Sequence, residues 1–181
     1  MYTIINHKQE NVIEFDNRNY SILDHIKRNP GIRHRELLRL SSYPNGVLTY
    51  HLLVLERGNK VRVDRKRNKI TRYYLVDIPT EDSDIISCLR NKVTRRLIIF
   101  MIYHDQCTFS ELVESSGKAP STISWHLKWL KKAGIVSALV GEGRHLYGVV
   151  NSMEVKKILW SYKEAFTDNV VENYVEMIDK L

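Results

Sequence analysis

The chain has 181 residues, of which 43% are hydrophobic and 27% charged, and its formal net charge is +7. No apolar run approaches the roughly 20 residues of a membrane-spanning helix, and the start lacks the basic and apolar regions of a secretory signal. We therefore expect a soluble, cytoplasmic protein that does not enter a membrane. The two cysteines, Cys88 and Cys107, belong to no CxxC pattern, so neither a disulfide framework nor a zinc site is predicted and both are interpreted as buried apolar side chains.

The basic side chains are concentrated in two blocks. Residues 27–72 carry thirteen basic and three acidic side chains, and residues 91–150 carry eight basic and four acidic ones. The segments around these blocks are acidic on balance. Such a distribution is typical of a surface that binds a polyanion.

In chain order, residues 1–19 predict a short hairpin extension with strands at 3–6 and 11–15. Residues 20–77 then predict a small domain. Its elements are a helix at 21–28, a turn at 29–31, a helix at 33–40, a third helix that begins near Asn45 and ends at Gly58, and a hairpin over 61–76.

An acidic linker is expected at residues 78–84, where Pro79 marks a domain boundary. Residues 85–150 predict a second domain of the same design. Its elements are a helix that reaches about His104, a short helix at 108–116 capped by Thr108, a turn at Gly117, a third helix from Ser121 to Gly134, and a hairpin over 136–150.

An internal repeat supports this division. A shift of 75 residues aligns residues 22–63 with 97–138, and a period of 75 is too long for a solenoid unit of roughly 20 to 50 residues. We interpret it as a duplicated domain. The identical pairs are Glu36/Glu111, Leu37/Leu112, Ser41/Ser116, His51/His126, Leu52/Leu127, Leu55/Leu130 and Val61/Val136.

The C-terminal segment, residues 151–181, predicts one or two helices with a long apolar face, with a break near Thr167. We favour homodimerisation through this face over packing against the chain's own domains. The apolar positions are Val155, Ile158, Tyr162, Phe166, Val170, Tyr174, Ile178 and Leu181.

The third helices carry a family resemblance. Residues 49–52 (TYHL) followed by Leu55, and residues 124–128 (SWHLK) followed by Leu130 and Gly134, resemble recognition helices of ArsR-type and MarR-type regulators. The tandem arrangement is similar to regulators common in archaea. The resemblance implies a mainly α fold with small β-hairpins (α+β), in which two tandem winged helix-turn-helix domains precede a C-terminal helical segment.

In that fold the third helix lies in the major groove of double-stranded DNA and the hairpin, or wing, reaches the backbone or the minor groove. The paired-cysteine metal motif of metal-sensing ArsR proteins is absent from this sequence. Neither a metal nor another cofactor is therefore expected.

Candidate DNA contacts lie opposite the apolar stripes of the third helices and on the wings. Asn45 and Ser121 have an equally weighted alternative role as helix caps. If six to ten cations meet phosphates, affinity falls about 10³- to 10⁵-fold between 50 and 200 mM salt. The candidates are Asn45, Gly46, Thr49 and Tyr50; Arg62, Arg65, Lys66, Arg67, Lys69 and Arg72; Ser121, Thr122, Ser124, Trp125, Lys128, Lys131 and Lys132; and Arg144.

His51 and His126 occupy the same position in the two copies. A buried histidine with a hydrogen bond to a neighbouring turn is favoured over a ligand or a pH switch.

The sequence favours a DNA-binding transcription regulator without enzymatic activity, because it holds no Gly-rich phosphate loop, no paired carboxylates and no nucleophile with a fixed base. One alternative is an adaptor that docks to the transcription machinery. The other is a protein that binds structured RNA.

Overall fold

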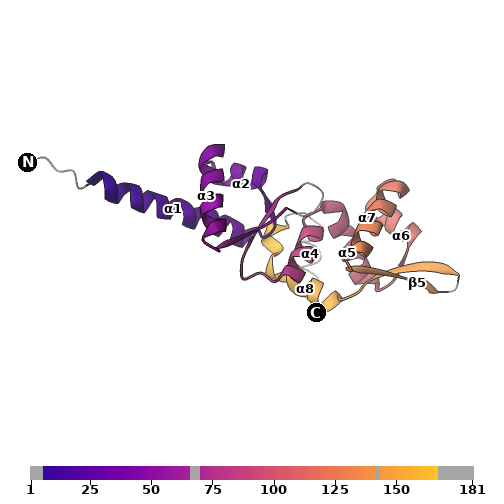
Figure 1. The fold of residues 1–181 in the computed structure, drawn as a ribbon. Coiled ribbons are helices and arrows are strands. Elements are labelled where there is room, and N and C mark those ends of the chain that lie inside the picture. The colour runs from indigo at the N-terminus through magenta and orange to yellow at the C-terminus, as the bar shows by residue number, and fades with distance from the viewer. Residues whose placement is uncertain (1–5, 66–69, 142, 167–181) are drawn as a thin grey trace, which may run out of the picture. The chain divides into compact units, whose positions relative to one another are not determined.

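The structure, a computed structural model, describes residues 6–65, 70–141 and 143–166. It combines α-helices with small antiparallel sheets and divides into two compact units at Pro79 and Thr80 (Figure 1). Within the described residues, no helix combines the length and the apolar character needed to cross a membrane.

The first unit is built on a long helix. Both α2 and α3 pack on the part of α1 that precedes Asn29 (Figure 1). The strands form one antiparallel sheet in the order β1-β3-β2. The elements are α1 (Asn6–Arg28), β1 (Ile32–Arg33), α2 (His34–Ser41), α3 (Asn45–Arg57), β2 (Val61–Asp64) and β3 (Arg72–Leu75).

The predicted N-terminal hairpin is wrong for the described residues. Helix α1 begins at Asn6 and continues to Arg28, so the expected strand at 11–15 is helical, while the expected strand at 3–6 lies almost wholly outside the described residues. No Gly or Pro occurs between residues 6 and 28 to stop a helix, and Lys8, Gln9 and Glu10, which we interpreted as a turn, are good helix formers.

The core of the first unit confirms the predicted apolar stripe of the third helix. The side chains of Leu48, Leu52 and Leu55 are buried against α1, α2 and the sheet. The other members of this core are Ile22, Ile26, Ile32, Leu37, Val61 and Tyr73. This packing fixes which face of α3 points outward.

The second unit has the same succession of elements, preceded and followed by a further helix. Its strands form an antiparallel sheet in the order β4-β6-β5. The elements are α4 (Thr80–Leu89), α5 (Lys92–His104), β4 (Cys107–Thr108), α6 (Phe109–Ser116), α7 (Pro120–Lys132), β5 (Val136–Gly141), β6 (Arg144–Val149), α8 (Ser152–Ser161) and a 3-10 turn (Lys163–Ala165).

The acidic linker expected at residues 78–84 is mostly helix. Helix α4 begins at Thr80 and places Glu81 and Asp82 in its first turn, where negative charge interacts favourably with the helix dipole. The acidic composition that we interpreted as a solvated linker is thus the start of a helix.

Two local signals in the second unit are confirmed. The Thr108 hydroxyl accepts a hydrogen bond from the Glu111 backbone N–H at 3.4 Å, and the Glu111 carboxylate accepts one from the Thr108 N–H at 2.7 Å, a capping box that starts α6. Gly117 ends that helix in the left-handed region with φ of 62°. The turn between α6 and α7 is therefore set by the sequence itself.

The described part of the C-terminal segment packs within the second unit. Val155, Ile158 and Phe166 are buried, and the Arg95 guanidinium lies 5.8 Å from the centre of the Phe166 ring. Helix α8 packs against α4. These apolar side chains are not available to a second copy. Of the other positions in the predicted stripe, Tyr162 is half-buried, and those beyond residue 166 lie outside the described residues.

Candidate nucleic-acid interface

The first turns of α3 present a polar surface. Asn45, Gly46, Thr49 and Tyr50 are exposed, and the Thr49 hydroxyl donates a 2.8 Å hydrogen bond to the Asn45 carbonyl. The residue before the helix is Pro44, and no side chain caps this end. Asn45 is therefore not the cap, and the interpretation of it as a cap is wrong.

Two of the described arginines of the first wing, Arg62 and Arg72, are engaged inside their own unit. Arg72 is only 5% exposed, and its Nη1 donates a 2.7 Å hydrogen bond to the Gly31 carbonyl. Arg62 is half-buried, donates from Nη2 to the Ile78 carbonyl at 2.8 Å and lies over the Tyr74 ring. Phosphate contact by Arg72 is ruled out by its burial, and Arg62 is held by the protein.

Arg65 is exposed but paired. Its two terminal nitrogens donate to the Glu56 carboxylate at 2.6 and 2.8 Å, which joins the wing to the end of α3. The hydrogen bond from Arg65 lowers the pKa of Glu56 below its usual value. The remaining predicted wing residues, Lys66, Arg67 and Lys69, lie outside the described residues.

Helix α7 separates a buried face from an exposed, polar face more clearly than α3 does. Ile123, His126, Leu127 and Leu130 are buried. The predicted contact residues are all exposed, and they are Ser121, Thr122, Ser124, Trp125, Lys128, Lys131 and Lys132. The face thus carries three hydroxyls, three ammonium groups and one aromatic ring.

The start of α7 explains why its hydroxyls are available. The residue before the helix is Ala119 and Pro120 occupies the first helical position, where its fixed φ suits a helix and its missing N–H costs nothing. Ser121 is therefore the second helical residue and not the cap, which corrects the alternative role given to it. Its hydroxyl lies in the first turn of the helix, where the backbone N–H groups of Thr122 and Ile123 both donate to the Ala119 carbonyl at 3.0 and 3.2 Å.

The charges on α7 are free. Among the described residues, none offers a hydrogen bond or an ion pair to Lys128, Lys131 or Lys132. Trp125 is 56% exposed and meets the Trp129 ring at a centroid distance of 6.3 Å. This contrasts with the first wing, where each described arginine has a partner.

The second wing is less basic. Arg144, at the start of β6, is exposed and pairs in register with Gly141 of β5, while Leu139 and Val140 expose apolar side chains. The hairpin extends beyond α6 and α7 (Figure 1). Arg144 keeps its position as a predicted contact at the tip.

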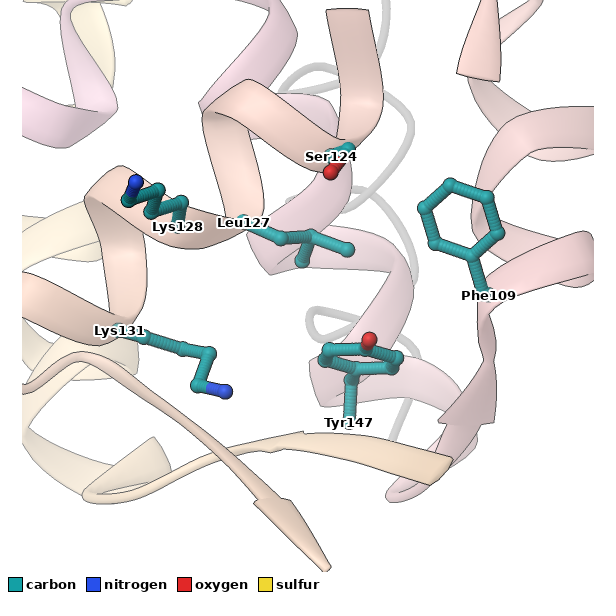
Figure 2. A pocket seen from close by; sticks show the side chains of 6 residues that line it. All are labelled: Phe109, Ser124, Leu127, Lys128, Lys131 and Tyr147. Carbon is teal, nitrogen blue, oxygen red and sulfur yellow. The ribbon is translucent and has the colours of Figure 1, made fainter. Parts of the chain in front are cut away.

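A pocket of about 200 Å³ lies between α7, α6 and β6 (Figure 2). Two of its residues, Phe109 and Tyr147, were not predicted from the sequence as site residues. Tyr147 reaches the pocket because β6 runs beside the helix pair, a tertiary arrangement that leaves no local signal. The lining residues are Phe109, Ser124, Leu127, Lys128, Lys131 and Tyr147.

The paired histidines are buried, as favoured from the sequence, but their surroundings differ. His51 Nδ1 lies 2.9 Å from Asn19 Oδ1, whereas His126 Nδ1 is buried and has no hydrogen-bond partner in the part of the chain that the structure describes. Burial, and then the charge of Arg18, lowers the pKa of His51; burial alone lowers the pKa of His126. His51 is thus hydrogen-bonded, but to a residue of α1 and not to a neighbouring turn as predicted. The predicted hydrogen bond is wrong for His126 Nδ1 among the described residues.

Cys88 and Cys107 are buried and neither forms a disulfide among the described residues, which agrees with their interpretation as buried side chains. Burial raises the pKa of Cys107 to about 11, with a smaller contribution from Glu111. Among the residues that the structure describes, His, Cys, Asp and Glu side chains form no group of three or more suited to a metal ion.

A short helix, a tight turn and a second helix with a polar outer face, followed by an antiparallel hairpin, define a winged helix-turn-helix. The sequence of the second unit agrees with this class. Residues 92–138, from α5 into β5, match the profile of the bacterial regulatory proteins of the arsR family. The ArsR-type resemblance predicted for this unit is thereby confirmed.

Two further proteins are similar to this chain. One is an uncharacterised HTH-type transcriptional regulator of Methanocaldococcus jannaschii, 27% identical over 145 residues, which are 80% of this chain and 36% of that protein. The chain thus spans about a third of that relative's length. The other is the crystal structure of the transcriptional repressor BigR from Xylella fastidiosa, with 18% identity and a TM-score of 0.41 over 49% of this chain and 89% of that one.

Proposed function

We propose that the chain is a sequence-specific, double-stranded-DNA-binding transcription regulator built from two tandem winged-helix domains. The observation that carries this proposal is the outer face of α7, where hydroxyl and ammonium groups are exposed and unpaired above a buried apolar stripe. The match of residues 92–138 to ArsR-family regulators includes the whole of this helix and supports the proposal.

The order of side chains along α7 suits a helix in the major groove. Ser121, Thr122 and Ser124 lie near the N-terminus, where small hydroxyl groups can approach both bases and phosphates. Lys128 and Lys132 lie one and two turns further on, where they meet the phosphates that border the groove. Trp125, between these sets, offers an apolar surface for a thymine methyl.

The first unit contributes less charge than its composition predicted. We infer that α3 enters DNA with Asn45, Thr49 and Tyr50, while the described arginines of its wing hold the unit together. Of the predicted contacts, Lys128, Lys131, Lys132 and Arg144 carry a cation with no partner among the described residues. They neutralise about four phosphates, so affinity falls about 10²-fold between 50 and 200 mM salt. This is a weaker dependence than six to ten contacts give.

Fluorescence anisotropy with a labelled random duplex at low salt tests the proposal, with duplex RNA as competitor. We expect micromolar or tighter binding to DNA, a steep decrease with added salt and weak competition by RNA. The absence of binding at micromolar protein contradicts the proposal and points to the adaptor. Equal competition by RNA contradicts the preference for DNA.

We also propose that the regulator acts as a homodimer, as the C-terminal stripe predicts. Since Val155, Ile158 and Phe166 are used inside the second unit, the association falls to residues 167–181. Sedimentation equilibrium is expected to give twice the mass of one chain. A single-chain mass at micromolar concentration contradicts dimerisation and leaves DNA binding by each chain to be tested separately.

A further inference from the structure

We propose that the pocket between α7, α6 and β6 seats one backbone phosphate of duplex DNA together with its neighbouring deoxyribose. The site fixes the second unit on the DNA without reading a base. This inference rests on the proposed DNA-binding function. It adds Phe109 and Tyr147 to the contact surface and gives Lys131 a specific role.

The pocket is built on one stripe of the recognition helix. Four lining residues share one face of α7, because three of them lie three, four and seven residues after the first. They are Ser124, Leu127, Lys128 and Lys131. Phe109, the first residue of α6, and Tyr147 of β6 close the other sides. The pocket therefore lies where the recognition helix meets the base of the wing.

Its polar groups suit an anion. Figure 2 shows the Lys131 ammonium on the Tyr147 side of the pocket, while the Lys128 ammonium points away and only its stem contributes. Among the described residues, Lys131 and the hydroxyls of Ser124 and Tyr147 have no hydrogen-bond partner. None of the six described residues that line the pocket is acidic. One cation and two donors are thus unused around a single hollow.

The apolar part of the lining distinguishes a phosphodiester from a free phosphate ion. One wall of the pocket is apolar and consists of Phe109, Leu127 and the Tyr147 ring. A phosphate ion would make no apolar contact with this wall, whereas a deoxyribose would pack against it. Ser124, Lys128 and Lys131 are exposed, so the pocket opens toward solvent on the α7 side. A small-molecule site buries about 70–90% of its ligand, whereas a polymer backbone needs an open side to enter and leave.

The test compares the full chain with Lys131→Gln and Tyr147→Phe in anisotropy titrations against several unrelated duplexes at a series of salt concentrations. Lys156→Gln is the matched control, because Lys156 is an exposed lysine on α8. Inorganic phosphate serves as a competitor to separate the two sources of the anion. Thermal melting confirms that each variant folds.

We expect Lys131→Gln to lower the affinity for every duplex about tenfold at 0.1 M salt. The slope of log affinity against log salt is expected to become shallower by about 1. Tyr147→Phe is expected to weaken binding by about tenfold with the slope unchanged, because it removes a hydrogen bond to a charged group and no charge. The Lys156→Gln control is expected to match the wild type. Millimolar phosphate is expected not to displace the duplex beyond its effect as a salt.

A wild-type slope in Lys131→Gln, or wild-type affinity in Tyr147→Phe, overturns the phosphate site, while binding of duplex DNA by the wild type still upholds the proposed function. Specific displacement of DNA by phosphate, lost in Lys131→Gln, also overturns the proposal, because the site then holds a free anion. If the wild type itself binds no duplex, the proposed function fails and the phosphodiester assignment fails with it.

Discussion

The two units carry similar elements but use their basic residues differently. In the first unit Arg62, Arg65 and Arg72 donate to a carbonyl, a carboxylate and a second carbonyl of their own unit. In the second unit Lys128 and Lys131 have no partner among the described residues. The number of basic residues in a segment therefore does not measure the charge that it offers to a polyanion.

The choice between arginine and lysine follows the same division. A guanidinium carries five N–H donors in a rigid fork and is weakly hydrated, so it can be buried against carbonyl oxygens, as Arg72 is against Gly31. An ammonium group is strongly hydrated and stays in solvent, as on α7. The arginine-rich segment thus became a structural element, and the lysine-bearing helix kept an accessible charge.

The largest effect is expected when the free charge of the second unit is removed. The triple substitution Lys128→Gln, Lys131→Gln and Lys132→Gln is expected to lower duplex affinity about 10²- to 10³-fold at 0.1 M salt, since about three phosphate contacts are lost. Anisotropy titration measures this. The control is Lys156→Gln with Lys157→Gln on α8, and equal losses in both variants contradict the assignment of α7.

The next effect concerns stability. Arg72→Gln is expected to lower the free energy of unfolding by about 2–3 kcal/mol, because the buried Gly31 carbonyl loses a charged donor. Urea denaturation measures the change. The exposed Arg144→Gln is the comparison and is expected to leave stability within about 0.5 kcal/mol of the wild type. If Arg72→Gln is as stable as the wild type and binds DNA less well, Arg72 is a contact residue after all.

A smaller change in stability is expected when the equivalent histidines of the two units, His51 and His126, are substituted. His51→Leu is expected to lower the free energy of unfolding by about 1 kcal/mol, because Asn19 loses its hydrogen-bond partner. His126→Leu removes a buried nitrogen that has no partner among the described residues, so it is expected to leave the free energy of unfolding unchanged or to raise it. Urea denaturation of both variants at pH 7 measures the difference. A larger loss for His126→Leu contradicts the description of its Nδ1 as unpartnered.

The same two histidines are expected to make the stability of the protein depend on pH. Burial lowers the pKa of each in the folded protein, so their contribution to stability is complete above the unfolded pKa of about 6.5 and is lost as the pH falls through the folded value. Each leucine variant is expected to show a smaller loss of stability on acidification than the wild type.

The smallest effect is expected from releasing a cation in the first unit. Glu56→Gln removes the charged partner of Arg65, and this exposed ion pair contributes little stability. Duplex affinity is expected to rise about threefold to tenfold at 0.1 M salt as Arg65 becomes available to a phosphate. Unchanged affinity in anisotropy shows that the first wing lies away from DNA.

Local patterns predicted the elements that local chemistry controls. The stripe of Leu48 and Leu52, the Thr108 cap and the turn at Gly117 depend on residues within one or two turns of each other. The start of α1 and the helix at Thr80 were missed because polar and acidic residues fit a helix as well as a loop. The residues of these two segments alone do not decide between a helix and a loop.

The candidate site shows the same limit. The exposed face of α7 followed from the spacing of its apolar residues, whereas the burial of Arg72 depends on Gly31, 41 residues away in sequence. Tyr147 reaches α7 only through the fold. Contacts of this kind have no periodic signal, so neither the burial of Arg72 nor the pocket could be predicted from the sequence.

The most direct test of the account places a photo-crosslinking benzoylphenylalanine at position 125 or at position 160 of the full chain. Trp125 on α7 and Trp160 on α8 are 56% and 44% exposed, so both tolerate the change and differ mainly in their surface. With a labelled duplex, the account predicts strong crosslinking from position 125 and background crosslinking from position 160. Crosslinking from position 160 alone, or equally from both, contradicts it.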